Sequence, residues 1–161
     1  MAMQARKIFP TLLVAAAVAI PAACSRMGGD VYMNNVEGSW QKESAQVFSF
    51  EIKDAQQPKN IIFVVRNNED YPYSNLRVFS VLTKEGGKAA TPDTLNFILA
   101  KPNGEWVGSG FGTVKETLFQ YRTNYRFPES GRYRLEVRQA MRRDTLPGIE
   151  DFGVMIENTK P

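Results

Sequence analysis

Apolar and polar residues alternate with a period of two along most of the chain beyond residue 36. In the first clear example, Phe48, Phe50 and Ile52 alternate with Ser49 and Glu51. Successive side chains of a strand point to opposite faces of a sheet, so this pattern predicts half-buried strands. The same alternation recurs in three later segments, 76–82, 118–126 and 132–139.

One apolar run differs from these segments because it does not alternate. Ile61–Val65 is apolar at every position and rich in β-branched residues, which predicts a central strand, and Leu95–Ala100 is a further candidate strand. Turn-forming pairs such as Gly86-Gly87 and Asn103-Gly104 separate the segments. With no long helical period, the sequence predicts an all-β protein, an antiparallel β-sandwich of the jelly-roll or immunoglobulin-like type.

The alternation also predicts one specific hairpin, between 118–126 and 132–139. Pairing Arg126 with Arg132 would place both apolar sets on one face, with Tyr125 beside Tyr133, and a slip of one residue would bury the arginines. The outer face would then carry a basic patch, either a solvated sheet face or a site for an anionic partner. The patch consists of Arg122, Arg126, Arg132, Arg134 and Arg138.

The first 23 residues predict a cleaved lipoprotein signal peptide. Two basic residues precede thirteen mostly apolar ones, Ile8–Ile20, whereas a membrane-spanning helix needs about 20. The small residues Ala22 and Ala23 stand directly before Cys24, a pattern that lipoprotein processing enzymes read. We expect cleavage before Cys24 and fatty acyl chains on its thiol, which explains a lone cysteine in an exported chain. An ordinary secreted protein is the alternative.

Cleavage would leave 138 of the 161 residues. We expect a lipidated N-terminus and tether at 24–35 and a single β-sandwich domain at 36–161. The mature chain would carry 18 basic and 17 acidic residues, and a formal charge of +1 argues against a nucleic-acid partner.

The residues that carry most enzyme chemistry are missing. The chain has no histidine, which excludes the usual nucleophilic triads and imidazole metal sites. A lipidated hydrolase would need two carboxylates facing a cleft, and the sequence marks out no such pair. We therefore expect no catalytic residues, no cofactor, no bound metal and no small-molecule substrate.

Two polar or glycine-rich motifs have both a functional and a structural interpretation. Gly108–Gly112 superficially resembles a phosphate-binding loop but lacks the required spacing and context, so a bulged strand or close packing of a ring is predicted. Asn67–Asp70 offers oxygens to a calcium ion, but without EF-hand spacing a polar turn explains it equally well.

The chain is rich in aromatic residues, with ten Phe, six Tyr and two Trp. Tyr71 and Tyr73 lie in a predicted turn and Trp106 follows another, so all three are candidates for exposure, where rings could stack on sugars. A carbohydrate-binding envelope lipoprotein is therefore the alternative function. The same rings could instead seal one end of the sandwich.

Three blocks of the chain, in this order and spacing, resemble the gliding motility lipoprotein GldH family. They are 66–76, 92–110 and 131–153. The resemblance implies a membrane-anchored lipoprotein needed for gliding in Gram-negative bacteria whose motility machinery is tied to a dedicated secretion system. It implies a structural or assembly role with other envelope proteins as partners. It brings no catalytic residue, and Cys24 alone corresponds to a functional position. The chain after Cys24 has no dense acidic cluster, which favours the periplasmic side.

The third block contains an irregular link, 139–148, between two predicted strands, and such loops commonly carry recognition. We expect this link and the Tyr71–Asn75 turn to form one protein-binding edge. Arg142 could instead pair with Asp144 or Asp151 to hold the loop. The candidate partner-binding residues are Tyr71, Tyr73, Asn75, Arg142 and Asp144.

Overall fold

The computed structural model describes residues 29–88 and 90–159, and these residues form ten β-strands and no helix. The predicted all-β class is confirmed. The predicted signal peptide and Cys24 lie outside the described residues, within which no helix is long and apolar enough to cross a membrane. The strands are β1 (Gly29–Asn35), β2 (Ser39–Gln41), β3 (Gln46–Ile52), β4 (Lys59–Asn67), β5 (Asn75–Lys84), β6 (Asp93–Ile98), β7 (Lys115–Tyr125), β8 (Gly131–Gln139), β9 (Thr145–Pro147) and β10 (Ile149–Asn158).

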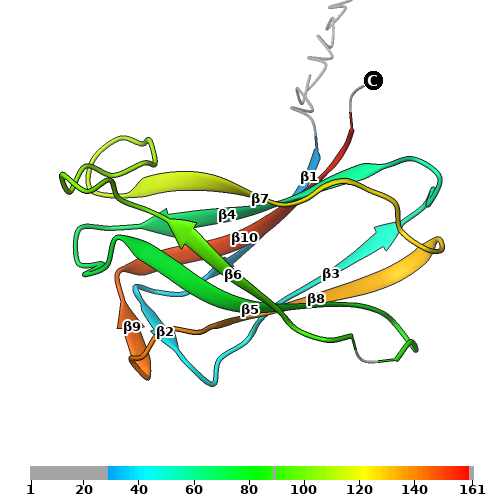
Figure 1. Ribbon diagram of the computed structural model, residues 1–161, viewed down its shortest axis with the longest axis horizontal. Coiled ribbons are helices and arrows are strands. Elements are labelled where there is room, and N and C mark those ends of the chain that lie inside the picture. Colours follow the sequence, from blue (N-terminus) through cyan, green and yellow to red (C-terminus); the bar gives the residue numbers. More distant parts are fainter. Residues whose placement is uncertain (1–28, 89, 160–161) are drawn as a thin grey trace, which may run out of the picture.

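Two four-stranded antiparallel sheets pack face to face (Figure 1). The first sheet has the order β1-β10-β4-β7 and the second has the order β3-β8-β5-β6. A two-stranded pair, β2-β9, extends from one end. The core between the sheets is rich in rings, with the Phe152 centroid 5.1 Å from that of Trp40 and 5.3 Å from that of Phe63. Burying each such side chain contributes about 1.5–3 kcal/mol, so the sandwich depends on this cluster.

Strand β4 is the central strand that the unbroken apolar run predicts. It lies between β10 and β7 in the first sheet, and every residue from Ile61 to Val65 is buried. The alternating segments also bury the expected faces, as Phe48, Phe50 and Ile52 on β3 show. The hydrophobic pattern therefore assigned these strand faces correctly.

The predicted hairpin between 118–126 and 132–139 is wrong. Strand β7 pairs with β4 in the first sheet, whereas β8 pairs with β3 and β5 in the second. The connection between β7 and β8 crosses the core, where the Phe127 ring lies 4.9 Å from Tyr125 and 4.7 Å from Tyr133. Both apolar faces are buried as predicted, but they face one another across the sandwich instead of sharing one surface.

The described chain begins and ends at the same end of the sandwich (Figure 1). Gly29 pairs with Glu157, so residues 29–35, which the sequence placed in the tether, form an edge strand of the first sheet. We call this the termini end; it also carries loops 53–58 and 126–130. The opposite end, called the far end, carries loops 68–74, 99–114 and 140–144 and the β2-β9 pair. The nine residues of β4 connect the two ends, a length of about 27 Å.

Candidate anchoring and docking surfaces

The candidate partner-binding residues all lie at the far end, but not all are available to a partner. Tyr71 is only 3% exposed, and its hydroxyl donates to the carbonyl oxygen of Asn75 at 2.7 Å. The backbone of Tyr71 lies so close to Gly148 that a Cβ atom added at position 148 would clash with the Tyr71 backbone. Burial, followed by the nearby Tyr73, raises the pKa of the Tyr71 hydroxyl. Tyr71 therefore seals the end of the sandwich, which is one of the two roles that the sequence left open.

The other candidates are more accessible. Tyr73 is half-buried with its ring 5.8 Å from that of Tyr71, and Asn75 donates to the side chain of Asn96 at 2.5 Å. Trp106 is also half-buried and packs against the core. Within the part of the chain that the structure describes, exposed aromatic rings do not form a coplanar set. This arrangement gives no support to a sugar-stacking groove.

Neither of the ion pairs considered for Arg142 is formed. Asp144 lies 3.6 Å from Lys42, while Asp151 lies 3.6 Å from Arg66. Arg142 is exposed and has no salt bridge to the residues in the described ranges. Arg142 and Asp144 therefore offer charged groups to the solvent at the far end.

Sequence reasoning missed the residue that holds the 140–144 loop. Gln139 is 1% exposed, and its Nε2 donates to the carbonyl oxygen of Arg143 at 2.8 Å. Its Oε1 accepts a hydrogen bond from the backbone N–H of Met141 at 2.9 Å. A glutamine at an inward-facing position of a predicted strand was the available signal, because a buried amide needs partners.

The predicted basic patch is not continuous, because its members lie on opposite sheets. Arg122 pairs with Asp93 at 2.6 Å, and its guanidinium lies 4.9 Å from the centre of the Tyr121 ring. Arg126 donates to the carbonyl oxygen of Gln56 at 3.1 Å. These two arginines therefore lie with the first sheet and its loops. The other three members, Arg132, Arg134 and Arg138, lie on the outer face of the second sheet.

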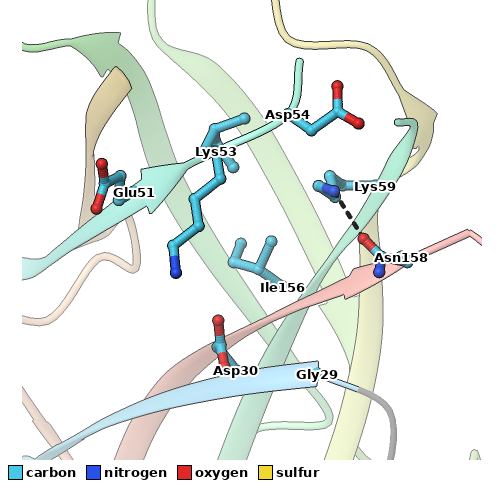
Figure 2. A pocket seen from close by; sticks show the side chains of 9 residues that line it. Gly29, Asp30, Glu51, Lys53, Asp54, Lys59, Ile156 and Asn158 are labelled. Carbon is cyan, nitrogen blue, oxygen red and sulfur yellow. Dashed lines mark hydrogen bonds between the residues drawn. The ribbon is translucent and has the colours of Figure 1, made fainter. Parts of the chain in front are cut away.

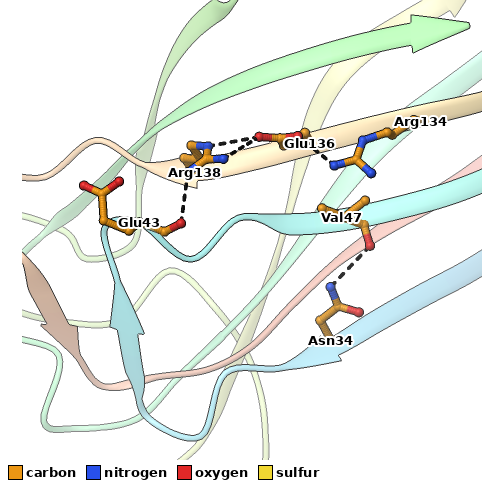
Figure 3. A network of polar contacts seen from close by, with 6 residues as sticks. All are labelled: Asn34, Glu43, Val47, Arg134, Glu136 and Arg138. Carbon is orange, nitrogen blue, oxygen red and sulfur yellow. Dashed lines mark hydrogen bonds and ion pairs between the residues drawn. The ribbon is translucent and has the colours of Figure 1, made fainter.

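The three arginines of the second sheet each pair with a carboxylate, Arg132 with Glu85 at 3.9 Å and the other two with one shared glutamate. Figure 3 shows Arg134 and Arg138 on either side of Glu136, each 2.9 Å from one of its carboxylate oxygens. These hydrogen bonds, led by that from Arg134, hold the pKa of Glu136 below its usual value despite partial burial. Arg138 also donates to the carbonyl oxygen of Glu43 at 2.9 Å. This network fits a solvated, internally paired sheet face better than a strong anion site.

The same view shows a polar link between the two edge strands. The side-chain amide of Asn34 on β1 donates to the carbonyl oxygen of Val47 on β3 at 3.5 Å (Figure 3). It also donates to the side chain of Gln46 at 3.1 Å. These bonds join the first sheet to the second along one side. They help to close the sandwich where backbone groups of the edge strands would otherwise be unpaired.

A cavity of about 440 Å³ opens between the sheets at the termini end (Figure 2). Ile52 and Ile156 contribute apolar surface to it, and Lys59 donates to Asn158 at 2.6 Å. Lys53 extends across the cavity toward Asp30 in Figure 2, and it forms no ion pair with the residues that the structure describes. The remaining charged side chains are Glu51 and Asp54. The cavity thus holds both signs of charge directly beside the first described residue of the chain.

The two ambiguous motifs are both structural in their local geometry. Asn68 accepts a hydrogen bond from the backbone N–H of Asp70 at 2.8 Å, as expected of a polar turn. Over the ranges described, no cluster of three acidic, His or Cys side chains could hold a metal ion. The Gly108–Gly112 segment lies near the end of the long loop between β6 and β7, where Gly108 and Gly110 approach the start of β7 closely. Close packing was predicted here, although the neighbours are the Thr117 hydroxyl and backbone carbonyl groups instead of a ring.

Comparison with known proteins assigns the chain to a family. A protein of Christiangramia forsetii named "Gliding motility lipoprotein GldH homolog" is 39% identical over 127 residues, covering 74% of this chain and 78% of its own. "Gliding motility lipoprotein GldH" of Flavobacterium johnsoniae is 29% identical over 153 residues, which cover 91% of this chain and 94% of that protein. Among solved structures, dimeric latent PorU from Porphyromonas gingivalis matches 81% of this chain and 13% of its own chain, with 11% identity. The TM-score of this match is 0.37, which is too low to carry an argument.

The sequence model described as GldH lipoprotein matches residues 30–156, which include nearly the whole sandwich. The resemblance drawn from the three sequence blocks is confirmed by this match and by the two relatives. The chain belongs to the GldH lipoprotein family.

Proposed function

We propose that this protein is a lipid-anchored, non-enzymatic structural component of a bacterial gliding motility machinery and its associated secretion apparatus. The observation that carries the proposal is the family match over residues 30–156, since the relatives bear names that refer to gliding motility. Its partners are other envelope proteins of that machinery, and its sandwich faces the periplasm.

The proposed lipid on Cys24 gives the sandwich an orientation. Four residues separate Cys24 from Gly29, so the five Cα–Cα steps between them span at most about 18 Å. The termini end and its mixed-charge cavity then lie close to the bilayer surface. The far end lies about 27 Å from the termini end, since that is the length of β4. This orientation favours protein contacts at the far end and membrane contacts at the termini end.

A non-enzymatic role agrees with the electrostatics of the described carboxylates. A general acid at neutral pH needs a raised pKa. In the described ranges, the carboxyl groups with a resolved shift all have a lowered pKa, because Lys101, Lys84 and Arg134 respectively donate hydrogen bonds to Glu105, Glu129 and Glu136. These groups are held as carboxylates, which suits structural ion pairs.

Deletion of the gene, followed by complementation, tests the proposal. We expect the deletion strain to lose surface spreading and to export less of the proteins that the secretion system handles. The wild-type gene should restore both properties, and Cys24→Ala should restore neither and should lose incorporation of labelled palmitate. A deletion strain that spreads and secretes normally would overturn the proposed function. Palmitate labelling that persists in Cys24→Ala would overturn the anchor.

A further inference from the structure

Phe111 is the most exposed large apolar residue in the described part of the chain. Its relative exposure is 104%, and it lies in the loop between β6 and β7 at the far end. A single exposed apolar residue is ordinary on a protein surface and requires no explanation by itself. The backbone on both sides of Phe111 is held in place by the glycines at 108 and 112 and by polar contacts to β7, which include those of the Lys115 ammonium.

Glycines flank Phe111 where other residues would not fit. A Cβ at Gly108 would lie 2.5 Å from the Thr117 hydroxyl oxygen and 2.6 Å from the Glu116 carbonyl oxygen. Gly112 has a φ of +72°, a conformation that side chains disfavour. A flexible linker would impose neither requirement. The glycine motif therefore serves to hold one particular loop shape.

Polar contacts then fasten this loop to β7. The backbone groups of Ser109 and Glu116 exchange two hydrogen bonds of 3.0 and 2.8 Å. The ammonium of Lys115 donates to the carbonyl oxygens of Gly110 and Gly112, at 3.2 and 2.9 Å. One lysine thus binds the residues on both sides of Phe111. A ring presented on an ordered loop loses little conformational entropy on binding, which favours affinity.

We propose that the Gly108–Gly112 loop is a preformed docking knob, with Phe111 as the side chain that inserts into an apolar pocket of a protein partner. The partner pocket is uncharged around the ring, because the lysines of the β6–β7 loop and of the start of β7 are already engaged. Lys115 is bound to the two carbonyl groups, and Lys101 pairs with Glu105 at 3.0 Å. An aromatic side chain filling a desolvated pocket is the usual form of an interface hot spot.

The orientation under the proposed function identifies a protein as the occupant, and this step rests on the lipid anchor at Cys24. Because β4 separates the far end from the termini end by about 27 Å, Phe111 lies at the end of the sandwich opposite Gly29, where the tether to the proposed lipid begins. A second copy of the chain also exposes an apolar groove, which is lined by Phe79 and Val81, and the mass of a crosslinked adduct distinguishes this occupant.

Site-specific photo-crosslinking in living cells tests the inference in the full-length, anchored protein. Benzoylphenylalanine replaces Thr113, an exposed residue of the same loop, and the adduct is compared among wild type, Phe111→Ser and Phe111→Leu. A matched control places the crosslinker at Gln56, an exposed residue at the termini end. Purified Phe111→Ser should keep its melting temperature within about 3 °C, because the side chain contacts solvent.

We expect one discrete adduct from position 113, absent from position 56, which mass spectrometry identifies as a single protein. Phe111→Ser should reduce its yield by about 30-fold, as for a hot-spot truncation, while Phe111→Leu retains it. An adduct with the mass of two copies, an adduct to lipid alone, no adduct, or one that survives Phe111→Ser would each overturn the inference. If the partner lies outside the motility and secretion machinery, the docking knob stands and the proposed function loses support.

Discussion

The two ends of the sandwich are built in different ways. At the far end, buried polar side chains such as Gln139 and Tyr71 fix the loops through hydrogen bonds to the backbone. At the termini end, Lys53 and Asp30 face a cavity without forming ion pairs. The termini end also has a loop that is held by a buried hydroxyl, since Tyr133 donates to the carbonyl oxygen of Glu129 at 2.8 Å. The difference between the ends therefore lies in the charged cavity and not in how the loops are held.

The largest expected effect of breaking this contrast is at Gln139. Replacement by Ala leaves the Met141 N–H and the Arg143 carbonyl without their partner, so we expect a loss of about 2–3 kcal/mol in the free energy of unfolding. Urea denaturation followed by fluorescence measures it. The control is Gln120→Ala on β7, which is exposed and should change stability by less than about 0.5 kcal/mol. Equal values for the two variants would show that the far-end loop is not held in this way.

An intermediate effect is expected on the outer face of the second sheet, where charges are exposed but paired. Arg134 and Arg138 lower the pKa of Glu136, so its contribution is present above the unfolded-state pKa and is lost as pH falls through the lower folded-state value. Between pH 6 and pH 3, wild type should therefore lose up to about 1 kcal/mol more stability than Glu136→Gln. Denaturation curves at both pH values measure this, with Glu69→Gln in an exposed turn as the control. A Glu136→Gln variant with the same pH dependence as wild type would contradict the assignment.

The smallest effect is expected at the termini end. Lys53→Ala removes a side chain that forms no ion pair, so the free energy of unfolding should change by less than about 0.5 kcal/mol. Thermal unfolding of the two purified proteins checks this value. A loss comparable to that of Gln139→Ala would remove the distinction between the ends.

The sequence pattern predicted strands and their buried faces well, but it did not predict which strands pair. Alternation in 118–126 and 132–139 specifies an inward and an outward face for each segment, and a hairpin or a crossing of the core satisfies both equally. Phe127 distinguishes the two arrangements, because a ring in the middle of a connection needs a buried place. Strand partners depend on such long-range packing, which local periodicity does not contain.

The candidate site was predictable only in part. The far-end location of Tyr71 and Arg142 followed from their positions in links between strands. The burial of Tyr71 did not follow from the sequence, because Tyr71 is covered by a close approach to Gly148 that no local pattern reveals. The glycines around Phe111 were visible in the sequence, but whether a ring beside them is covered or presented depends on the contacts of Lys115.

The position of β1 has a mechanical consequence for a protein that is held at one end and loaded at the other. Gly29, where the described chain begins, lies at the termini end, and β1 runs from there toward the far end along β10. With the proposed lipid at Cys24 and the proposed partner at Phe111, a pull between the two would act along these strands and across their hydrogen bonds. All seven residue pairs of β1 and β10 then resist the pull together, because the strands are loaded in shear and their hydrogen bonds do not break one pair at a time.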